Sequence, residues 1–110
     1  MAQIHDLRIH RARRVSRQIR YLFRLYTTGN TARSARALRN LVGLCEMRLK
    51  GRYQLEVIDI YQDPGRASEA QIIAAPTLVK ESPAPVCRLV GDLSDDEKVI
   101  QSLGLSEEGR

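Results

Sequence analysis

Residues 21–31 decide the fold, because they combine a strand, a tight turn and the start of a helix: Tyr-Leu-Phe-Arg-Leu-Tyr-Thr-Thr-Gly-Asn-Thr. The aromatic and apolar side chains from Tyr21 to Tyr26 are typical of a buried strand. Gly29-Asn30 breaks this strand, and Thr31 opens a helical pattern. The stretch therefore predicts the first half of a βαβ unit.

The helical pattern extends from Thr31 to about Leu49, with apolar side chains at steps of three and four residues. Asn30 or Thr31 can cap the first N–H groups, and Gly51 is expected to end the helix. Three arginines follow a three-residue step and are expected to face solvent or an acidic partner: Arg33, Arg36 and Arg39.

The second strand is predicted at Tyr53–Ile60. Apolar residues occur there at both odd and even positions, which indicates a strand covered on both faces. The order strand, helix, strand predicts that it joins the first strand by a parallel, right-handed crossover. Asp59 interrupts the apolar run, so we expect it at the exit of the strand or paired. Asp63 can cap a short second helix that begins at Pro64 and continues to Ile73.

The last third of the chain predicts two short strands and a helix. Residues 75–80 and 86–90 flank a turn rich in proline and are expected to pair antiparallel. Ser94 and Glu97 match a capping box at the start of the last helix, and Gly104 is expected to end it.

Length and composition limit the class of protein. A chain of 110 residues with 43% hydrophobic and 28% charged residues fits one soluble, cytoplasmic domain. No apolar run approaches the roughly 20 residues of a membrane span, and residues 1–20 lack the apolar centre of a secretory signal. Cys45 and Cys87 have neither metal-binding nor C-x-x-C spacing, so we expect them to pack as small hydrophobes in a reducing compartment. We therefore predict no metal and no cofactor.

Charge divides the chain into a basic extension, a domain and a tail. Residues 1–20 hold six arginines and one acidic residue, Asp6, whereas residues 21–110 hold equal numbers of basic and acidic residues. We expect 1–20 to be flexible or helical, 21–105 to form the domain, and 106–110 to fray. The extension could attract nucleic acid or an acidic partner, could be a solvated tail, or could precede the true translation start. Because it lacks aromatic residues and the rest is neutral, we do not expect nucleic acid as the main partner.

The predicted order, β-α-β-α-β-β-α, resembles the three-layer α/β arrangement of thioredoxin. In thioredoxins the turn before the first helix carries the reactive cysteine pair, and here residues 27–34 contain none. Five motifs, spread over residues 21–100, resemble the KaiB family of circadian clock proteins: Leu25-Tyr26 with Gly29-Asn30-Thr31, Arg36-Ala37-Leu38, Val57-Ile58-Asp59, Ala75-Pro76-Thr77-Leu78, and Gly91-Asp92-Leu93-Ser94.

The resemblance to KaiB implies a protein without catalytic activity. It would bind a KaiC-like ring ATPase and modulate its phosphorylation and ATPase cycle, in circadian or stress-related signalling. Further implied partners are a histidine kinase, a KaiA-like protein, and other copies of the chain in a dimer or tetramer. The alternatives are an adaptor that acts on a histidine kinase, and a thioredoxin-like redox protein, which the missing cysteine pair argues against.

The resemblance also suggests residues that bind partners and residues that influence the fold. Arg36, Tyr53 and Lys80 match family positions implicated in partner binding, with charge steering by Arg36 and Lys80 and edge contacts by Tyr53 and Gln54. Gln71 is also expected to bind a partner. Clock members carry a lysine at the positions of Glu56 and Gln71. The family has a second, self-associating ground-state fold with a different C-terminal half. The corresponding fold-switch positions here are Ser102 and Gly104.

Overall fold

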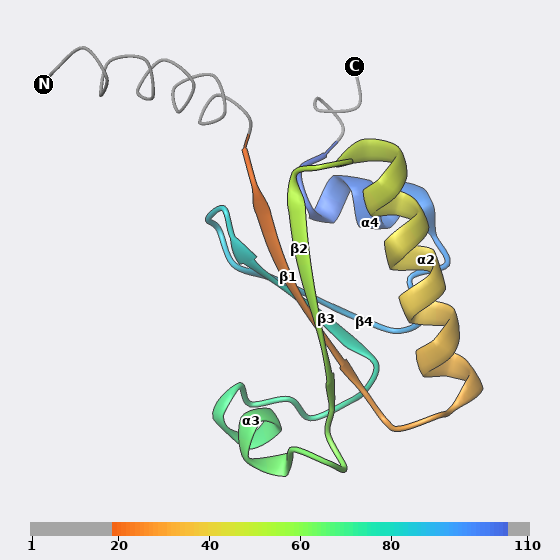
Figure 1. Ribbon diagram of the computed structural model, residues 1–110, viewed down its shortest axis with the longest axis vertical. Helices are drawn as coiled ribbons and strands as arrows, with labels where there is room; N and C mark the ends of the chain where they lie inside the picture. Colours follow the sequence, from red (N-terminus) through yellow and green to blue (C-terminus); the bar gives the residue numbers. More distant parts are fainter. Residues whose placement is uncertain (1–18, 106–110) are drawn as a thin grey trace, which may run out of the picture.

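The computed structural model of the protein describes residues 19–105. Its elements in chain order are β1 (Tyr21–Thr27), α2 (Ala32–Arg48), β2 (Tyr53–Asp59), α3 (Pro64–Glu69), β3 (Thr77–Ser82), β4 (Cys87–Val90) and α4 (Asp96–Ser102). Figure 1 shows this order along one twisted sheet. The predictions of a flexible or helical extension before residue 19 and of a frayed tail at 106–110 lie outside the described residues.

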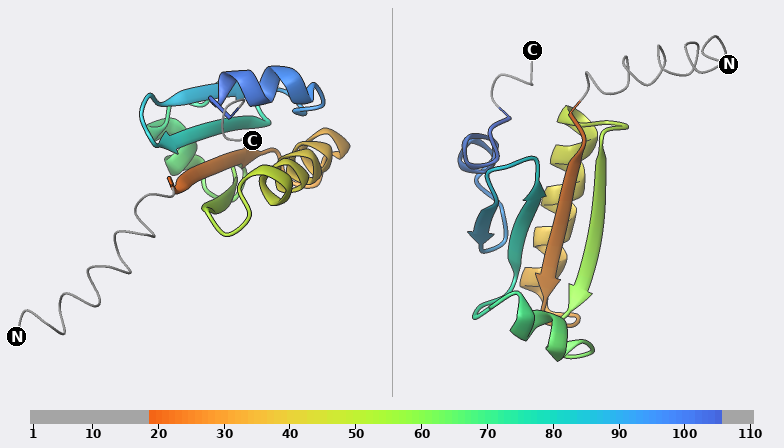
Figure 2. Two further views of the ribbon diagram at one scale, coloured as in Figure 1. Left: turned by 90° about the horizontal axis from the view of Figure 1, so that it is seen from above. Right: turned by 90° about the vertical axis from the view of Figure 1, so that its left-hand side faces the viewer.

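The sheet has the strand order β2-β1-β3-β4. β1 pairs parallel with β2 and antiparallel with β3, and β3 pairs antiparallel with β4. Two helices, α2 and α4, cover one face of the sheet, and α3 lies against the other face at one end (Figure 2). These three layers confirm the predicted thioredoxin-like arrangement.

The core has two parts because β1 is covered on both faces. The larger part lies under α2 and α4 and includes Phe23 and Leu25 of β1, Leu41 of α2, and Leu103 and Leu105 at the end of α4. The smaller part lies under α3 and is formed by residues of β1, β2 and β3 and of the loops on either side of α3: Tyr26, Ile58, Val79, Ile60, Ala70 and Ile72. The apolar stretch from Tyr21 to Tyr26 therefore joins both layers of helices to the sheet.

Two predictions for the middle of the chain are wrong. β2 is an edge strand whose two faces are only partly covered: Ile58 packs in the smaller core and Leu55 lies half-buried against the larger one, whereas Val57 is 46% exposed. The short helix ends at Glu69 instead of continuing to Ile73, whose side chain is 98% exposed. The chain turns at Gln71, which has a φ of 58°. A helix of six residues cannot cover the edge strand as well as the centre of the sheet.

The helix ends test the capping predictions. Thr31 caps α2, since its Oγ1 accepts a hydrogen bond from the Ser34 N–H at 3.2 Å. Asp63 makes no such bond at α3. At α4 the cap is Asp95, whose Oδ1 accepts from the Lys98 N–H at 3.2 Å, so the capping box predicted for Ser94 and Glu97 is wrong by one residue.

The end of α4 has the predicted glycine. Gly104 adopts a φ of 72°, a left-handed conformation that glycine accepts readily. This turn lets the Leu105 N–H donate to the Ile100 carbonyl at 2.9 Å and places the Leu105 side chain in the core. The last helix is thereby fastened at both ends.

Candidate protein-interaction surface

The turn between β1 and α2 is closed by hydroxyl groups. The Thr28 N–H donates to Ser34 Oγ at 3.0 Å, and the hydroxyls of Thr28 and Thr31 lie 3.1 Å apart. Ser34 is buried beneath the turn. This network satisfies the polar groups of the turn with oxygen atoms, and no sulfur atom is present among residues 27–34.

Asp59 ties the end of β2 to the same turn. Its Oδ1 accepts from the Gly29 N–H at 3.2 Å and from the Tyr61 N–H at 2.9 Å. Asp59 is the last residue of β2, which confirms the expectation that it lies at the strand exit or is paired. Its carboxylate is engaged in holding two loops together.

Neither cysteine lies at the turn. Cys45 is 1% exposed near the C-terminal end of α2, and burial, with a smaller contribution from Glu46, raises the pKa of its thiol to about 12. Cys87 lies on β4, and its Sγ donates to the Ser102 carbonyl at 3.3 Å. Both thiols are free. Within residues 19–105 no group of three potential metal ligands comes together.

Arg36 lies on the exposed side of α2 and contacts the loop that precedes α4. Its Nε is 3.3 Å from Asp92 Oδ2, and the Asn40 side-chain amide donates to the Asp92 carbonyl at 2.7 Å. Hydrogen bonding by the Ser94 side chain, followed by weaker effects that include Arg36, lowers the pKa of Asp92. The ion pair holds α2 to the loop and leaves much of the Arg36 guanidinium accessible.

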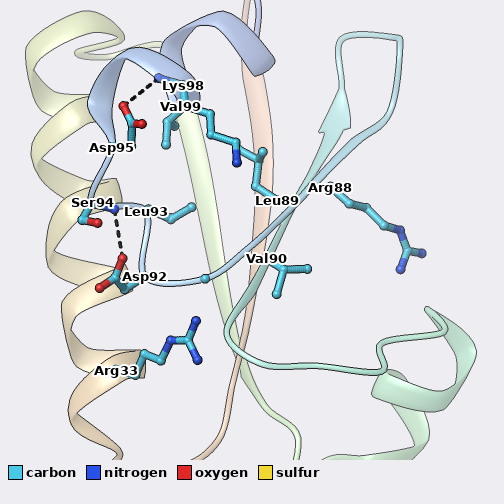
Figure 3. A pocket seen from close by; sticks show the side chains of 11 residues that line it. Arg33, Arg88, Leu89, Val90, Asp92, Leu93, Ser94, Asp95, Lys98 and Val99 are labelled. Atoms are coloured by element: carbon cyan, nitrogen blue, oxygen red, sulfur yellow. Dashed lines mark hydrogen bonds between the residues drawn. The ribbon is translucent and has the colours of Figure 1, made fainter.

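An open pocket of about 560 Å³ lies on the β4 side of this loop. Figure 3 shows Arg33 of α2 at one end of the pocket and Lys98 of α4 at the other, with the apolar side chains of Leu89, Val90, Leu93 and Val99 lining the pocket. Its neighbour Arg88 turns away from the pocket toward α3, where it donates to the carbonyls of Ala70 and Gln71. The pocket is thus a shallow feature between α2, β4 and α4.

Tyr53 and Gln54 begin the edge strand β2. The Tyr53 hydroxyl donates to Glu46 Oε2 at 2.7 Å, and this hydrogen bond is the main cause that raises the pKa of Tyr53 to about 12. Gln54 is exposed. Within the described part of the chain the outer edge of β2 has no strand partner, which leaves its backbone groups accessible to another protein.

The remaining predicted residues are scattered. Gln71 is exposed beside α3, whereas Lys80 is 4% exposed, with its Nζ 6.0 Å from the centre of the Tyr21 ring. The interpretation of Lys80 as an exposed steering charge therefore does not fit this arrangement. Ser102 ends α4 and is exposed, and Gly104 follows it. The predicted partner-binding residues come from α2, β2, β3 and the α3–β3 loop and do not form one patch.

Sequence reasoning missed an ion-pair network on the face of the sheet that α3 leaves open. Arg24 of β1 lies 3.1 Å from Glu56 of β2 and 3.1 Å from Glu81 of β3, and Arg66 of α3 also binds Glu56. One indication of the network is visible in the sequence, because a charged residue lies within each of two otherwise apolar strands, Arg24 in β1 and Glu56 in β2. Only the parallel register, in which Arg24 faces Glu56, shows that they pair.

The network predicts an acid-sensitive contribution to stability. Hydrogen bonds from Arg66 and then Arg24 lower the pKa of Glu56 from 4.5 to about 2. A lowered pKa means that the stabilisation is present above pH 4.5 and is lost as the pH falls toward 2. We expect the stability of Glu56→Gln, measured by urea unfolding at several pH values, to fall less steeply in this range than that of the unmodified protein. Glu97→Gln on exposed α4 is the control, and parallel profiles for Glu56→Gln and the unmodified protein would contradict the expectation.

Comparison with known proteins places this geometry in a family. The model of the KaiB domain matches residues 24–105, which include the hydroxyl turn, the β2 edge and the Arg36–Asp92 pair. The chain belongs to the KaiB family. It is 42% identical over 90 residues to the circadian clock protein KaiB3 of Synechocystis sp., an alignment that covers 82% of this chain and 88% of that protein. It is 48% identical over 85 residues to the circadian clock oscillator protein KaiB of Synechococcus elongatus, covering 77% and 83%.

Solved structures support the fold of this KaiB-family chain. The N-terminal domain of Synechococcus elongatus SasA superposes with a TM-score of 0.63 at 22% identity, covering 81% of this chain and 88% of that one. Mitochondrial thioredoxin 3 of Saccharomyces cerevisiae superposes with a TM-score of 0.62 at 15% identity, covering 90% and 89%. At these identities the similarity establishes a thioredoxin-like fold and nothing more about function.

Proposed function

We propose that this KaiB-family chain is a non-catalytic adaptor that binds a KaiC-like ring ATPase and modulates its phosphorylation and ATPase cycle. The observation that carries the proposal is the family match over residues 24–105 on a thioredoxin-like fold whose helix-start turn is built from hydroxyls. Thiol–disulfide exchange needs an accessible thiolate at that turn. Without it, the accessible surface of α2 and the edge of β2 are the parts of the fold that can act on another molecule.

Arg36 is the residue whose position best suits a charged interface. Its guanidinium is held by Asp92 on one side and reaches solvent on the other, and its side chain is 48% exposed. Arginine is enriched among the residues that dominate binding energy, and a charge at the rim of an interface steers association. We propose that Arg36 contacts an acidic region of the ATPase, with Tyr53 and Gln54 at the β2 edge and Gln71 beside α3 as further contacts.

Arg36→Glu is expected to weaken binding to the KaiC-like ATPase. Reversal of a single interface charge places like charges together, which costs several kcal/mol when they are juxtaposed. The purified chain and the ATPase are to be applied to a sizing column with ATP, and we expect loss of co-elution for the variant. Arg39→Glu is the matched control, because Arg39 is an exposed arginine of the same helix without an ion pair to the α4 loop in the described structure.

Loss of the Arg36–Asp92 pair must be separated from loss of the interface. Asp92→Asn removes the same ion pair but keeps Arg36, so it should retain co-elution if Arg36 acts on the partner directly. Equal loss in Arg36→Glu and Asp92→Asn would assign the effect to the loop. Unchanged binding by Arg36→Glu would remove Arg36 from the interface.

Four further proposals accompany the adaptor function. A histidine kinase or a KaiA-like protein would be additional partners, and the chain would form dimers or tetramers when it adopts the ground-state fold. Ser102 and Gly104 would influence the exchange between folds, since the positive φ of Gly104 favours glycine in the arrangement seen here. We propose a cytoplasmic location. Among the described helices none is long and apolar enough to span a membrane.

A further inference from the structure

Two cationic side chains at the pocket beside the loop before α4 make no ion pair among residues 19–105. Arg33, in the first turn of α2, and Lys98, on α4, lie at opposite ends of the pocket, and we call them the end cations (Figure 3). Both are exposed. The third cation of the lining, Arg88, turns away and donates to the carbonyls of Ala70 and Gln71. Two positive charges therefore remain available to a ligand, one at each end.

The two carboxylates that line the same pocket are engaged by the chain itself. Asp92 Oδ2 lies 3.3 Å from Arg36 Nε, and Asp92 Oδ1 accepts from the Ser94 N–H at 3.1 Å. Asp95 Oδ1 accepts from the Lys98 N–H at 3.2 Å, as the cap of α4. These carboxylates are therefore directed to α2 and to backbone N–H groups, and they leave the side chains of the end cations without an acidic partner from the described residues.

Between the end cations the lining is apolar and its backbone is held in place. Leu93 and Val99 are buried, and Leu89 is half-buried. Leu93 adopts a φ of 61°, a left-handed conformation that is uncommon for a residue other than glycine. The neighbouring Asp92 is fixed by its ion pair to α2 and by the Asn40 amide, which donates to its carbonyl at 2.7 Å. Strained residues persist where the surrounding structure enforces them, and they cluster at ligand sites. The loop thus forms a preorganised wall.

We propose that this pocket binds a small molecule with an anionic group at each end of an apolar chain, of which an α,ω-dicarboxylate is the simplest. The planar guanidinium of Arg33 matches the two oxygens of one carboxylate, and the Lys98 ammonium attracts the other as a point charge. The pocket volume of about 560 Å³ lies within the range of about 300–1,000 Å³ that is usual for small-molecule sites. A ligand with one charge would leave one end cation unused. Binding here does not require the ATPase partner proposed above.

The test compares suberate, a dicarboxylate, with octanoate, which has the same chain length and a single carboxylate. Both are titrated into the isotope-labelled full chain at low salt, where the charges are least screened, and the backbone amides are followed by NMR. Suberate should shift the amide signals of Gly91, Leu93 and Val99 saturably. It should bind about tenfold more tightly than octanoate, because a hydrogen bond between charged groups contributes about that factor.

Variants of the end cations test the two charges separately. Arg33→Gln should weaken suberate binding about tenfold, to the level of octanoate. Lys98→Glu should weaken it at least as much, and it should leave the protein folded because an acidic side chain in the first turn of a helix is favourable. Arg39→Gln is the matched control, since Arg39 is an exposed arginine of the same helix that does not line this pocket. It should leave suberate binding unchanged.

Several results would overturn the proposal. Absence of saturable shifts at the pocket amides would mean that no dicarboxylate site exists there. Equal affinities for suberate and octanoate would indicate a site for one charge, and unchanged suberate binding by Lys98→Glu would have the same meaning. An equal loss in Arg39→Gln and Arg33→Gln would indicate general attraction to a basic helix. Tighter binding of a blocked tripeptide with two acidic residues around a leucine would identify the occupant as a protein segment instead of a small molecule.

Discussion

Phe23→Ala should lower the free energy of unfolding by about 3–5 kcal/mol, the usual cost of truncating a fully buried phenylalanine. Phe23 is the single phenylalanine of the chain and is 0% exposed. Its ring is stacked 5.9 Å from that of Tyr21 and belongs to the core cluster that joins β1 and α2 to Leu103 and Leu105. The substitution therefore leaves a cavity between the first half of the chain and its C-terminal helix. Against a typical total stability of about 5–15 kcal/mol, this loss is large.

Urea unfolding followed by circular dichroism measures this effect as a shift of the midpoint at constant slope. Ile73→Ala is the control, because the Ile73 side chain is 98% exposed and its truncation should change stability by less than about 0.5 kcal/mol. A change below about 1 kcal/mol for Phe23→Ala would show that the two halves do not share the core seen here. A changed slope would indicate that the variant populates a different compact state.

The elements that the sequence predicted well are those with long apolar periodicity. β1 and α2 agree closely with residues 21–26 and 31–49, since their apolar faces fill both sides of the sheet. The weaker predictions depended on choices between equivalent local signals. Ser94 and Asp95 can both cap a helix, and only the hydrogen bond from the Lys98 N–H to Asp95 Oδ1 shows which of them does. For β2, position in the sheet determined burial, and no local pattern encodes that position.

The candidate site was less predictable because it depends on register and exposure. The family resemblance gives Lys80 a role in charge steering, yet Lys80 is buried and faces Phe23 across the β1–β3 pair, on the side of the sheet that α2 and α4 cover. The network of Arg24, Glu56, Glu81 and Arg66 requires three strands and a helix to be placed before any pair is visible. By contrast, the absence of a reactive thiol at the first turn could be read directly from residues 27–34 and agrees with the hydroxyl network found there.

Cys45 in the folded protein should react with iodoacetamide at least about a thousandfold more slowly than an ordinary cysteine. Its pKa is raised from 9.0 to about 12, mainly by burial, and each unit lowers the thiolate fraction about tenfold at neutral pH. Since the side chain is also 1% exposed, the reagent reaches it only when the structure opens. This prediction separates an adaptor from a redox protein, because thiol chemistry requires an accessible thiolate.

The experiment follows alkylation by mass spectrometry in two single-cysteine variants, Cys87→Ala and Cys45→Ala, with and without urea. In urea the thiols should react at similar rates. In buffer the Cys45→Ala variant, which retains the half-buried Cys87, should react much faster than Cys87→Ala, which retains Cys45. Rapid alkylation of Cys45 in buffer would mean that α2 separates readily from the sheet. If either variant also lost a disulfide-reductase activity shown by the unmodified chain, the adaptor interpretation would be wrong, because a thiol would then perform the chemistry that the hydroxyl turn cannot.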